Sequence, residues 1–326
     1  MASVIPRVLY LSHAGADVYA LIRAAAGLRF EVVTLNQDDD DERCRRIVDC
    51  EAVICAAKRL TKRHLDAGDK LKVVHHQGVG WQDTTDWQEI KRRGLPLALT
   101  PQGTTIGVAE HTVLLMLAAA KRLTFADAEL RQGRWHVNAL RGVSREMHGK
   151  TVGYVGMGRI AQAVAERLKS FGCAGIYTDL AVRLTKAEEG ALGLRAGTFD
   201  EVLAAADILS FHVPLTDNTR GLLDRSALSR LKRGAIVVNT ARGGIIDEAA
   251  LADALKSGQV LAAGLDVFEQ EPPDLTSPLL TLPNVVLTPH ISAGTQDAMS
   301  QKMDALFHNL ERFFRTGRLD NQVAFP

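Results

Sequence analysis

Three charged or titratable side chains follow apolar segments of the chain and could share one reactive site. Arg242 comes directly after AIVVNTA, Glu271 after GLDVFEQ and His290 after NVVLTP. A guanidinium matches the planar shape of a carboxylate. An imidazole exchanges a proton near neutral pH, and a neighbouring carboxylate orients it. Together the three residues predict a site for a carbonyl or alcohol group that lies beside a carboxylate, although each alone also fits an ordinary loop.

A glycine-rich corner precedes these residues. In TVGYVGMGRIAQAVAERL (Thr151–Leu168), Gly156, Gly158 and Ala161 fit the pattern G-x-G-x-x-G/A. The first glycine allows a tight turn, the second leaves space for a pyrophosphate, and the third position packs the helix against the strand. The free N–H groups at the helix start would bind the phosphate. Taken alone, the pattern also fits a tight structural turn.

Asp179, at the end of the next apolar segment, strengthens the interpretation of the glycine pattern. An acidic residue about 20 positions further on is suited to a ribose 2′-hydroxyl. A carboxylate would repel a 2′-phosphate, so Asp179 predicts NAD as the cofactor. Arg183, four positions later, leaves NADP as the alternative, and a surface loop acid is the other interpretation of Asp179.

Short apolar segments alternate with helical patterns along nearly the whole chain, which predicts parallel sheets covered on both faces. Ligands bind beyond the carboxyl ends of the strands in such sheets, where Arg242, Glu271 and His290 stand. Two series of segments predict two α/β units, with a long helix at 105–123 between them and a helix at 296–317 that returns to the first unit. The expected strands cover residues 7–12, 30–35, 52–57, 72–76, 95–100, 151–156, 174–179, 207–212, 235–240, 260–268 and 284–290.

The composition argues against several functional classes. The chain has 326 residues, 46% of them hydrophobic and 24% charged, and its net charge of +1 would attract neither nucleic acid nor an anionic membrane. Its four cysteines lack CxxC spacing, so we expect free thiols and no bound metal. Residues 37–46, QDDDDERCRR, fit a solvated helix start better than a metal site. Because no signal peptide or membrane-length apolar segment is visible, we expect a cytoplasmic protein.

Six motifs give the chain a resemblance to a known family. They are GVAEHTVLLMLAAAKR, GKTVGYVGMGRIAQAVA, HVPLTDNTRGLL, NTARGGIIDEAALADAL, GLDVFEQEP and NVVLTPHISAGT. Together they resemble the D-isomer-specific 2-hydroxyacid dehydrogenases almost from end to end. The resemblance implies an α/β fold of two domains, in which a Rossmann NAD-binding domain at 104–290 is inserted into a split, flavodoxin-like substrate domain at 1–103 and 291–326. It also implies NAD-dependent conversion between a small D-2-hydroxy acid and its 2-keto acid.

The same resemblance implies a role for each matching residue. Arg242 would bind the substrate carboxylate and polarise its carbonyl, His290 would be the acid in reduction and the base in oxidation, and Glu271 would hold His290. A homodimer would form through the helix at 105–123 and an arm near 130–136. The backbone of the loop Gly78, Val79 and Gly80 would bind the substrate carboxylate. The cofactor would contact Gly156, Gly158, Arg159, Ile160, Asp179, Pro214, Thr240, Ala241 and Asp266.

One segment departs from the family pattern. Two other functions also fit the residues that carry the resemblance. Where the family often has GVGYDNID, this chain has GVGWQDTTD at residues 78–86. Trp81 there either reshapes the pocket or packs in the core, and His75 and His76 either contact substrate or complete a strand. Oxidation of phosphite would use the same Arg, Glu and His, and NAD-sensing corepressors share the fold. Formate-oxidising relatives carry Gln where this chain has Glu271.

Overall fold

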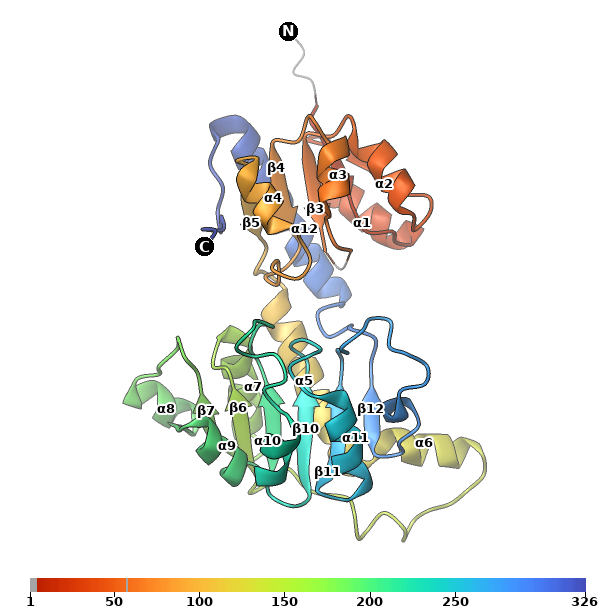
Figure 1. The fold of residues 1–326 in the computed structure, drawn as a ribbon, viewed down its shortest axis with the longest axis vertical. Helices are drawn as coiled ribbons and strands as arrows, with labels where there is room; N and C mark the ends of the chain where they lie inside the picture. The colour runs from red at the N-terminus through yellow and green to blue at the C-terminus, as the bar shows by residue number, and fades with distance from the viewer. Residues whose placement is uncertain (1–4, 57) are drawn as a thin grey trace. The chain divides into compact units, whose positions relative to one another are not determined.

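The computed structural model describes residues 5–56 and 58–326. The chain divides into two compact units, one formed by the segment up to Thr104 together with Thr295–Pro326, the other by Thr105–Gly294. The second unit is therefore inserted into the first (Figure 1). The boundaries expected after residues 103 and 290 lie after residues 104 and 294 in the structure.

The first unit is built on a five-stranded sheet. Its strands follow the order β2-β1-β3-β4-β5, and every neighbouring pair is parallel. This order is that of flavodoxin-like folds, as expected. Most of these strands end earlier than the sequence segments suggested, and residue 57, the end of one segment, lies outside the described residues. The strands are β1 (Arg7–Tyr10), β2 (Glu31–Val33), β3 (Ala52–Cys55), β4 (Val73–His76) and β5 (Leu97–Leu99).

Helices cover both faces of this sheet. On one face α12 packs along α1, because Met303, Leu306 and Leu310 recur at the spacing that gives a helix one apolar side. The predicted return of the last helix to the first unit is thus confirmed. The other face is covered by the three shorter helices. The bounds are α1 (Ala16–Ala26), α2 (Asp40–Ile47), α3 (Lys62–Ala67), α4 (Trp87–Arg92) and α12 (Gln296–Thr316).

The acidic start of α2 is only partly solvated. Asp39 caps the helix by accepting a hydrogen bond from the Glu42 N–H at 2.8 Å, as a helix start requires. Arg43, however, is fully buried, donates to the Leu11 carbonyl at 2.9 Å and pairs with Asp38 and Asp40. The expectation of a solvated segment is wrong for Arg43, because the folded loop after β1 supplies an acceptor that lies far away in sequence.

The second unit is built on a seven-stranded sheet in the order β12-β11-β10-β9-β6-β7-β8. All its neighbouring pairs are parallel. The central order is that of a Rossmann fold, extended by one strand, which confirms the expected fold class. The short edge strand β8 was not expected from the sequence. The strands are β6 (Thr151–Val155), β7 (Ala174–Thr178), β8 (Leu194–Ala196), β9 (Ile208–Phe211), β10 (Ala235–Asn239), β11 (Val260–Leu265) and β12 (Val285–Leu287).

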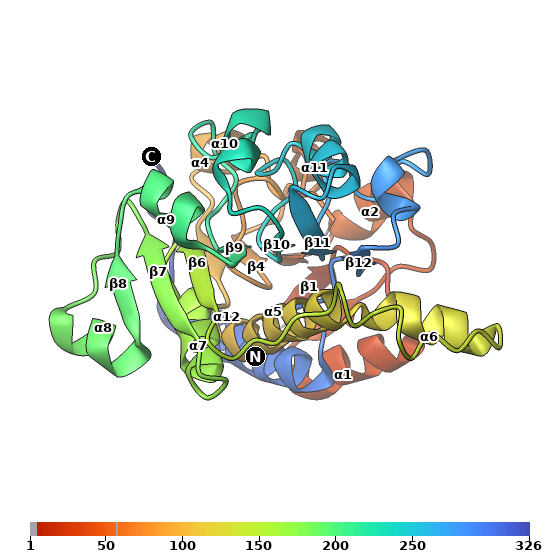
Figure 2. The ribbon, with the colours of Figure 1, turned by 90° about the horizontal axis from the view of Figure 1, so that it is seen from below.

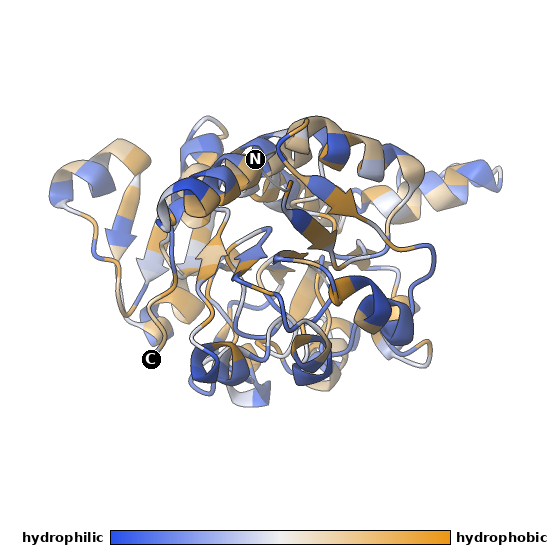
Figure 3. Ribbon diagram, turned by 90° about the horizontal axis from the view of Figure 1, so that it is seen from above, coloured by the Kyte–Doolittle hydropathy of each residue, from blue (hydrophilic) through white to orange (hydrophobic). Residues whose placement is uncertain are grey.

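Figure 2 shows α9, α10 and α11 on one face of this sheet and α5 and α7 on the other. Most strands of this sheet are largely apolar, whereas the helices carry both polar and apolar residues (Figure 3). Helix α5 lies close to β11, because a Cβ at Gly264 would stand 2.9 Å from the Leu115 Cβ. The helices are α5 (Thr104–Lys121), α6 (Leu123–Arg131), α7 (Arg159–Lys169), α8 (Lys186–Leu192), α9 (Phe199–Ala205), α10 (Arg225–Arg230) and α11 (Glu248–Lys256), with a 3-10 turn at Pro278–Leu280.

Two negative findings apply to residues 5–56 and 58–326. None of the helices there is long and apolar enough to cross a membrane. Nor do three or more His, Cys, Asp or Glu side chains gather there as a metal site would require.

Candidate active site

The loops that carry the predicted residues of the second unit all leave the same edge of its sheet, because the strands are parallel. Strands β6 and β9 are neighbours at the centre, and the chain proceeds outward from them in opposite directions. Such a switch point is where open α/β sheets bind ligands. The residues at this edge are Gly156, Gly158, Arg159, Ile160, Asp179, Pro214, Thr240, Ala241, Arg242, Asp266, Glu271 and His290.

The two glycines of the corner after β6 have different physical roles. Gly156 has φ +94°, and a Cβ there would stand 2.6 Å from the His212 carbonyl oxygen, so only glycine fits. Gly158 is the N-cap residue directly before α7, and a Cβ there would meet nothing within 4 Å. Gly156 is therefore required by the fold, whereas Gly158 borders open space in front of a helix start. Ala161 is fully buried against the sheet, so its methyl group is accommodated.

Asp179 lies directly beside this corner. One carboxylate oxygen accepts the Met157 N–H at 2.6 Å, and the other accepts the N–H groups of Ala181 and Val182 at 2.7 and 2.9 Å. Partial burial raises the pKa of Asp179, but these three N–H groups outweigh it and leave the pKa below its ordinary value. The loop after β7 thus holds an ionised carboxylate next to the open space at Gly158.

His290 and Glu271 form a hydrogen-bonded pair, 2.8 Å from Nδ1 to Oε2. The other Glu271 oxygen accepts the Phe268 N–H at 3.1 Å, which fixes the carboxylate. Partial burial raises the pKa of Glu271, but the hydrogen bond and charge of His290, the Phe268 N–H and the charge of Arg242 together lower it below its ordinary value. Because an ionised carboxylate only accepts, Nδ1 donates, and Nε2 remains the ring atom for proton exchange.

Arg242 is held in the same place by two features that the sequence analysis missed. Asn239, at the buried end of β10, accepts the Ala241 N–H at 3.0 Å and donates to the Arg242 carbonyl at 2.8 Å. Gly243 lets this loop touch the loop after β11, since a Cβ there would stand 2.6 Å from Glu269 N and closer still to Phe268. The structure therefore brings the three predicted reactive side chains together. A polar residue ending an apolar strand was the available signal for Asn239.

The remaining residues predicted around the nicotinamide differ in how exposed they are. Pro214 is exposed after β9, whereas Thr240 is buried and its hydroxyl lies 2.8 Å from that of Thr112. Asp266 is fully buried, and its carboxylate accepts hydrogen bonds from Thr288, Ile291 and Ser292. Asp266 therefore supports the loop that carries His290, a role that the sequence analysis did not anticipate.

In the first unit, Gly78, Val79 and Gly80 form an irregular loop after β4. The Thr100 N–H donates to the Gly78 carbonyl at 3.1 Å, and the Thr84 hydroxyl donates to the Gly80 carbonyl at 2.9 Å, so two of the three loop carbonyls are hydrogen-bonded. The N–H groups of the three residues have no acceptor within the described chain. Such amides can bind a carboxylate.

The residues whose roles stayed open beside this loop all have packing contacts within the first unit. Trp81 lies edge-on against Trp87 and Phe325 in the core. His75 is fully buried and 3.0 Å from the Asn309 amide, and burial lowers its pKa to about 3, so it stays neutral. His76 is also buried, and it contacts the Thr84 hydroxyl at 2.9 Å.

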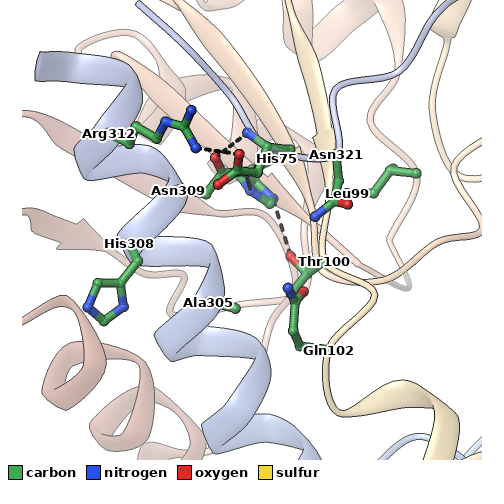
Figure 4. A pocket seen from close by; sticks show the side chains of 10 residues that line it. His75, Leu99, Thr100, Gln102, Ala305, His308, Asn309, Arg312 and Asn321 are labelled. Carbon is green, nitrogen blue, oxygen red and sulfur yellow. Dashed lines mark hydrogen bonds and ion pairs between the residues drawn. The ribbon is translucent and has the colours of Figure 1, made fainter. Parts of the chain in front are cut away.

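A polar cavity of about 390 Å³ lies between β5, α12 and the C-terminal segment (Figure 4). His75, Thr100 and Asn309 line its inner wall, while Arg312 on the rim pairs with Asp320. Apart from His75, whose role the sequence left open, it contains none of the residues predicted to bind substrate or cofactor.

Comparisons with known proteins identify the family. Residues 113–292 match the family described as "D-isomer specific 2-hydroxyacid dehydrogenase, NAD binding domain". The chain is 40% identical over 273 residues to D-3-phosphoglycerate dehydrogenase of Archaeoglobus fulgidus, covering 83% of this chain and 50% of that one. It is also 40% identical to hydroxypyruvate reductase of Thermotoga maritima, covering 82% of this chain and 85% of that one.

The fold is also similar to that of a solved structure from the same kind of enzyme. A glyoxylate reductase from Paecilomyes thermophila matches with a TM-score of 0.83 and 28% identity, covering 99% of both chains. The chain spans about half the length of the phosphoglycerate dehydrogenases that it matches. The chain belongs to the D-isomer-specific 2-hydroxyacid dehydrogenase family.

Proposed function

We propose that this protein is an NAD-dependent oxidoreductase that interconverts a small D-2-hydroxy acid and its 2-keto acid. The observation that carries the proposal is the Glu271–His290 pair, 2.8 Å apart, with Arg242 close enough for its charge to lower the pKa of Glu271. The pair can exchange a proton, and the arginine can bind an anionic substrate. A dinucleotide corner at the same sheet edge supports a redox reaction rather than simple hydration.

Each side chain has a distinct task in this proposal. Arg242 binds the substrate carboxylate and polarises the neighbouring carbonyl. In reduction His290 protonates the carbonyl oxygen from Nε2, and in oxidation it accepts the hydroxyl proton. Glu271 orients the ring and stabilises its charged form through Nδ1. The bound nicotinamide supplies or accepts the hydride. The N–H groups of the Gly78–Gly80 loop are proposed to bind the substrate carboxylate as well.

The cofactor is proposed to be NAD rather than NADP. Open space before α7 and its uncapped N–H groups suit the pyrophosphate, with Arg159 and Ile160 as the first residues of that helix. Asp179 is ionised, so it would accept hydrogen bonds from a ribose and repel a 2′-phosphate. Pro214, Thr240, Ala241 and Asp266 stay proposed neighbours of the nicotinamide half.

We also propose a cytoplasmic homodimer. Helix α6 has no buried residue in the single chain, and Leu123, Leu130 and Trp135 on and beside it are more than half exposed. Large apolar side chains that gather in one exposed region usually mark a contact with another protein chain. Sedimentation of the purified chain tests this, and a monomer would contradict it.

The activity is tested by following NADH oxidation with a panel of 2-keto acids. The panel contains glyoxylate, hydroxypyruvate, pyruvate, phenylpyruvate, 2-ketoisocaproate and 3-phosphohydroxypyruvate, each repeated with NADPH. Turnover of one or more acids with NADH is the expected result. A protein that binds NADH but turns over none of them would contradict the proposal. Phosphite with NAD⁺ is assayed in parallel, because turnover there would assign the same side chains to phosphite oxidation.

A further inference from the structure

The backbone of His290 adopts a conformation that needs support. Its φ is 53°, in the left-handed region of backbone conformation. Residues other than glycine adopt this conformation mainly where the surrounding structure imposes it. The His290 N–H donates to the Asp266 carbonyl at 2.8 Å and to the Thr288 carbonyl at 3.1 Å. The direction of the imidazole therefore depends on what holds Asp266 and Thr288.

The Asp266 side chain fixes the loop on both sides of His290. One carboxylate oxygen accepts the Thr288 hydroxyl at 2.6 Å and the Ile291 N–H at 2.9 Å. The other accepts the Ser292 N–H at 2.9 Å. Because the carboxylate is fully buried, each of these bonds is costly to lose.

Thr288 connects this carboxylate to helix α5. The His111 Nε2 atom lies 2.9 Å from the Thr288 hydroxyl and 3.6 Å from the nearer Asp266 oxygen. The single hydroxyl proton goes to Asp266, which can only accept, so the hydroxyl in turn accepts from Nε2–H of His111. Helix α5 is a firm support, because Leu115 packs against Gly264 of β11.

We propose that His111 and Thr288 are positioning residues that, through Asp266, hold the imidazole of His290 against Glu271. The inference rests on the proposed function for its kinetic meaning, but the geometry it describes is measurable without turnover. His111 lies more than 170 residues from His290 in sequence, on a helix that contributes no reactive group. A substitution of Thr288 removes this hydrogen-bonded connection and leaves the side chains of Arg242, Glu271 and His290 themselves unchanged.

Thr288→Val and Thr288→Ser form the matched pair of variants. Valine keeps the shape but removes the hydroxyl, whereas serine keeps the hydroxyl. The direct readout is the NMR signal of the His290 Nδ1 proton, assigned by its absence in His290→Ala. We expect Thr288→Val to lose or broaden that signal and Thr288→Ser to keep it. An unchanged signal in Thr288→Val overturns the inference, whether or not the protein turns over a keto acid.

Kinetics provide the second readout on the same variants. A reacting group displaced by about 1 Å can cost about 100-fold in rate, so we expect Thr288→Val to lower kcat by about 10- to 100-fold with KM and NADH affinity nearly unchanged. The pH profile for reduction should also change, because the imidazole of His290 would no longer be held on the Glu271 carboxylate. Thr288→Ser should recover most of both. A lower kcat with an unchanged pH profile would indicate only loss of folded protein and count against the inference.

Helix α5 is tested with a second matched pair. His111→Leu removes the donor, whereas His111→Gln retains an N–H group. We expect His111→Leu to change the His290 signal and the pH profile in the same way as Thr288→Val, and His111→Gln to restore them partly. A wild-type protein without turnover would refute the proposed function alone, since the NMR comparison still decides the positioning.

Discussion

Gly243→Ala should separate the two loops that form the reactive site. The loop after β10 carries Arg242, the loop after β11 carries Glu271, and they touch at Gly243. An added Cβ would stand 2.6 Å from Glu269 N and closer still to the Phe268 carbonyl oxygen. Because these neighbours are backbone atoms, no side chain can rotate away, and one loop must move.

The size of that movement follows from ordinary contact distances. A carbon atom rests about 3.3 Å or more from a carbonyl oxygen, so the loops must move apart by about 1 Å or more. A misplacement of about 1 Å of reacting groups can reduce the rate about 100-fold. Overpacking a filled site typically costs about 1–3 kcal/mol of unfolding free energy. We therefore expect kcat to fall by about two orders of magnitude and the melting temperature to fall by several degrees.

The assay compares Gly243→Ala with Gly142→Ala under saturating NADH and the best keto acid of the panel. Gly142 has open space around the position of a Cβ and no positive φ, so its substitution should change neither rate nor stability. A crystal structure of Gly243→Ala would show the widened loops directly. Full activity of this variant, with an unchanged melting temperature, would refute the inference that close approach of these loops builds the site.

Three further results are expected. Asp179→Ala should weaken NADH binding by about 10-fold or more, because hydrogen bonds to a charged group are lost. NADPH binding should weaken much less. Equal losses of affinity in binding titrations would show that Asp179 does not recognise the 2′-hydroxyl. Gly158→Ala should keep the melting temperature but weaken NADH binding, because the Cβ fills space free of protein; unchanged affinity would contradict a phosphate there. The pKa of Glu271 is lowered in the folded state, so its contribution to stability is complete above its ordinary pKa and is lost as pH falls through the lowered value. Thermal melts across acidic pH should show this loss in the wild type and not in Glu271→Gln, and parallel curves would contradict it.

The sequence predicted the site best where a strand and its following loop lie next to each other in the chain. Arg242, Glu271 and His290 each follow an apolar strand segment, so parallel pairing alone was enough to gather them at one edge. The same reasoning placed Asp179 beside the glycine corner, where its carboxylate accepts the Met157 N–H. The return of the last helix to the first unit was also predicted from the sequence pattern, whereas the Rossmann and flavodoxin-like sheets were expected only from the family resemblance.

Contacts between distant segments could not be predicted from the sequence. Nothing local in the sequence shows that His111 meets Thr288, which directly follows the last strand of their sheet. Trp81 stayed ambiguous until its contacts with Trp87 and Phe325 were visible. Arg43 looked exposed within a charged segment, although its partner, the Leu11 carbonyl, lies 32 residues earlier. Short edge strands such as β8 have too few apolar residues to be distinguished from a loop.

The most direct test of the central claim is transfer of deuterium from NADH labelled at the nicotinamide C4. The protein is incubated with the labelled cofactor and the best 2-keto acid, and the product is analysed by mass spectrometry and on a chiral column. The proposed function predicts a D-2-hydroxy acid with deuterium at C2, and His290→Ala should form it orders of magnitude more slowly while still binding NADH. An unlabelled product, an L-product, or a fully active His290→Ala variant would contradict the account.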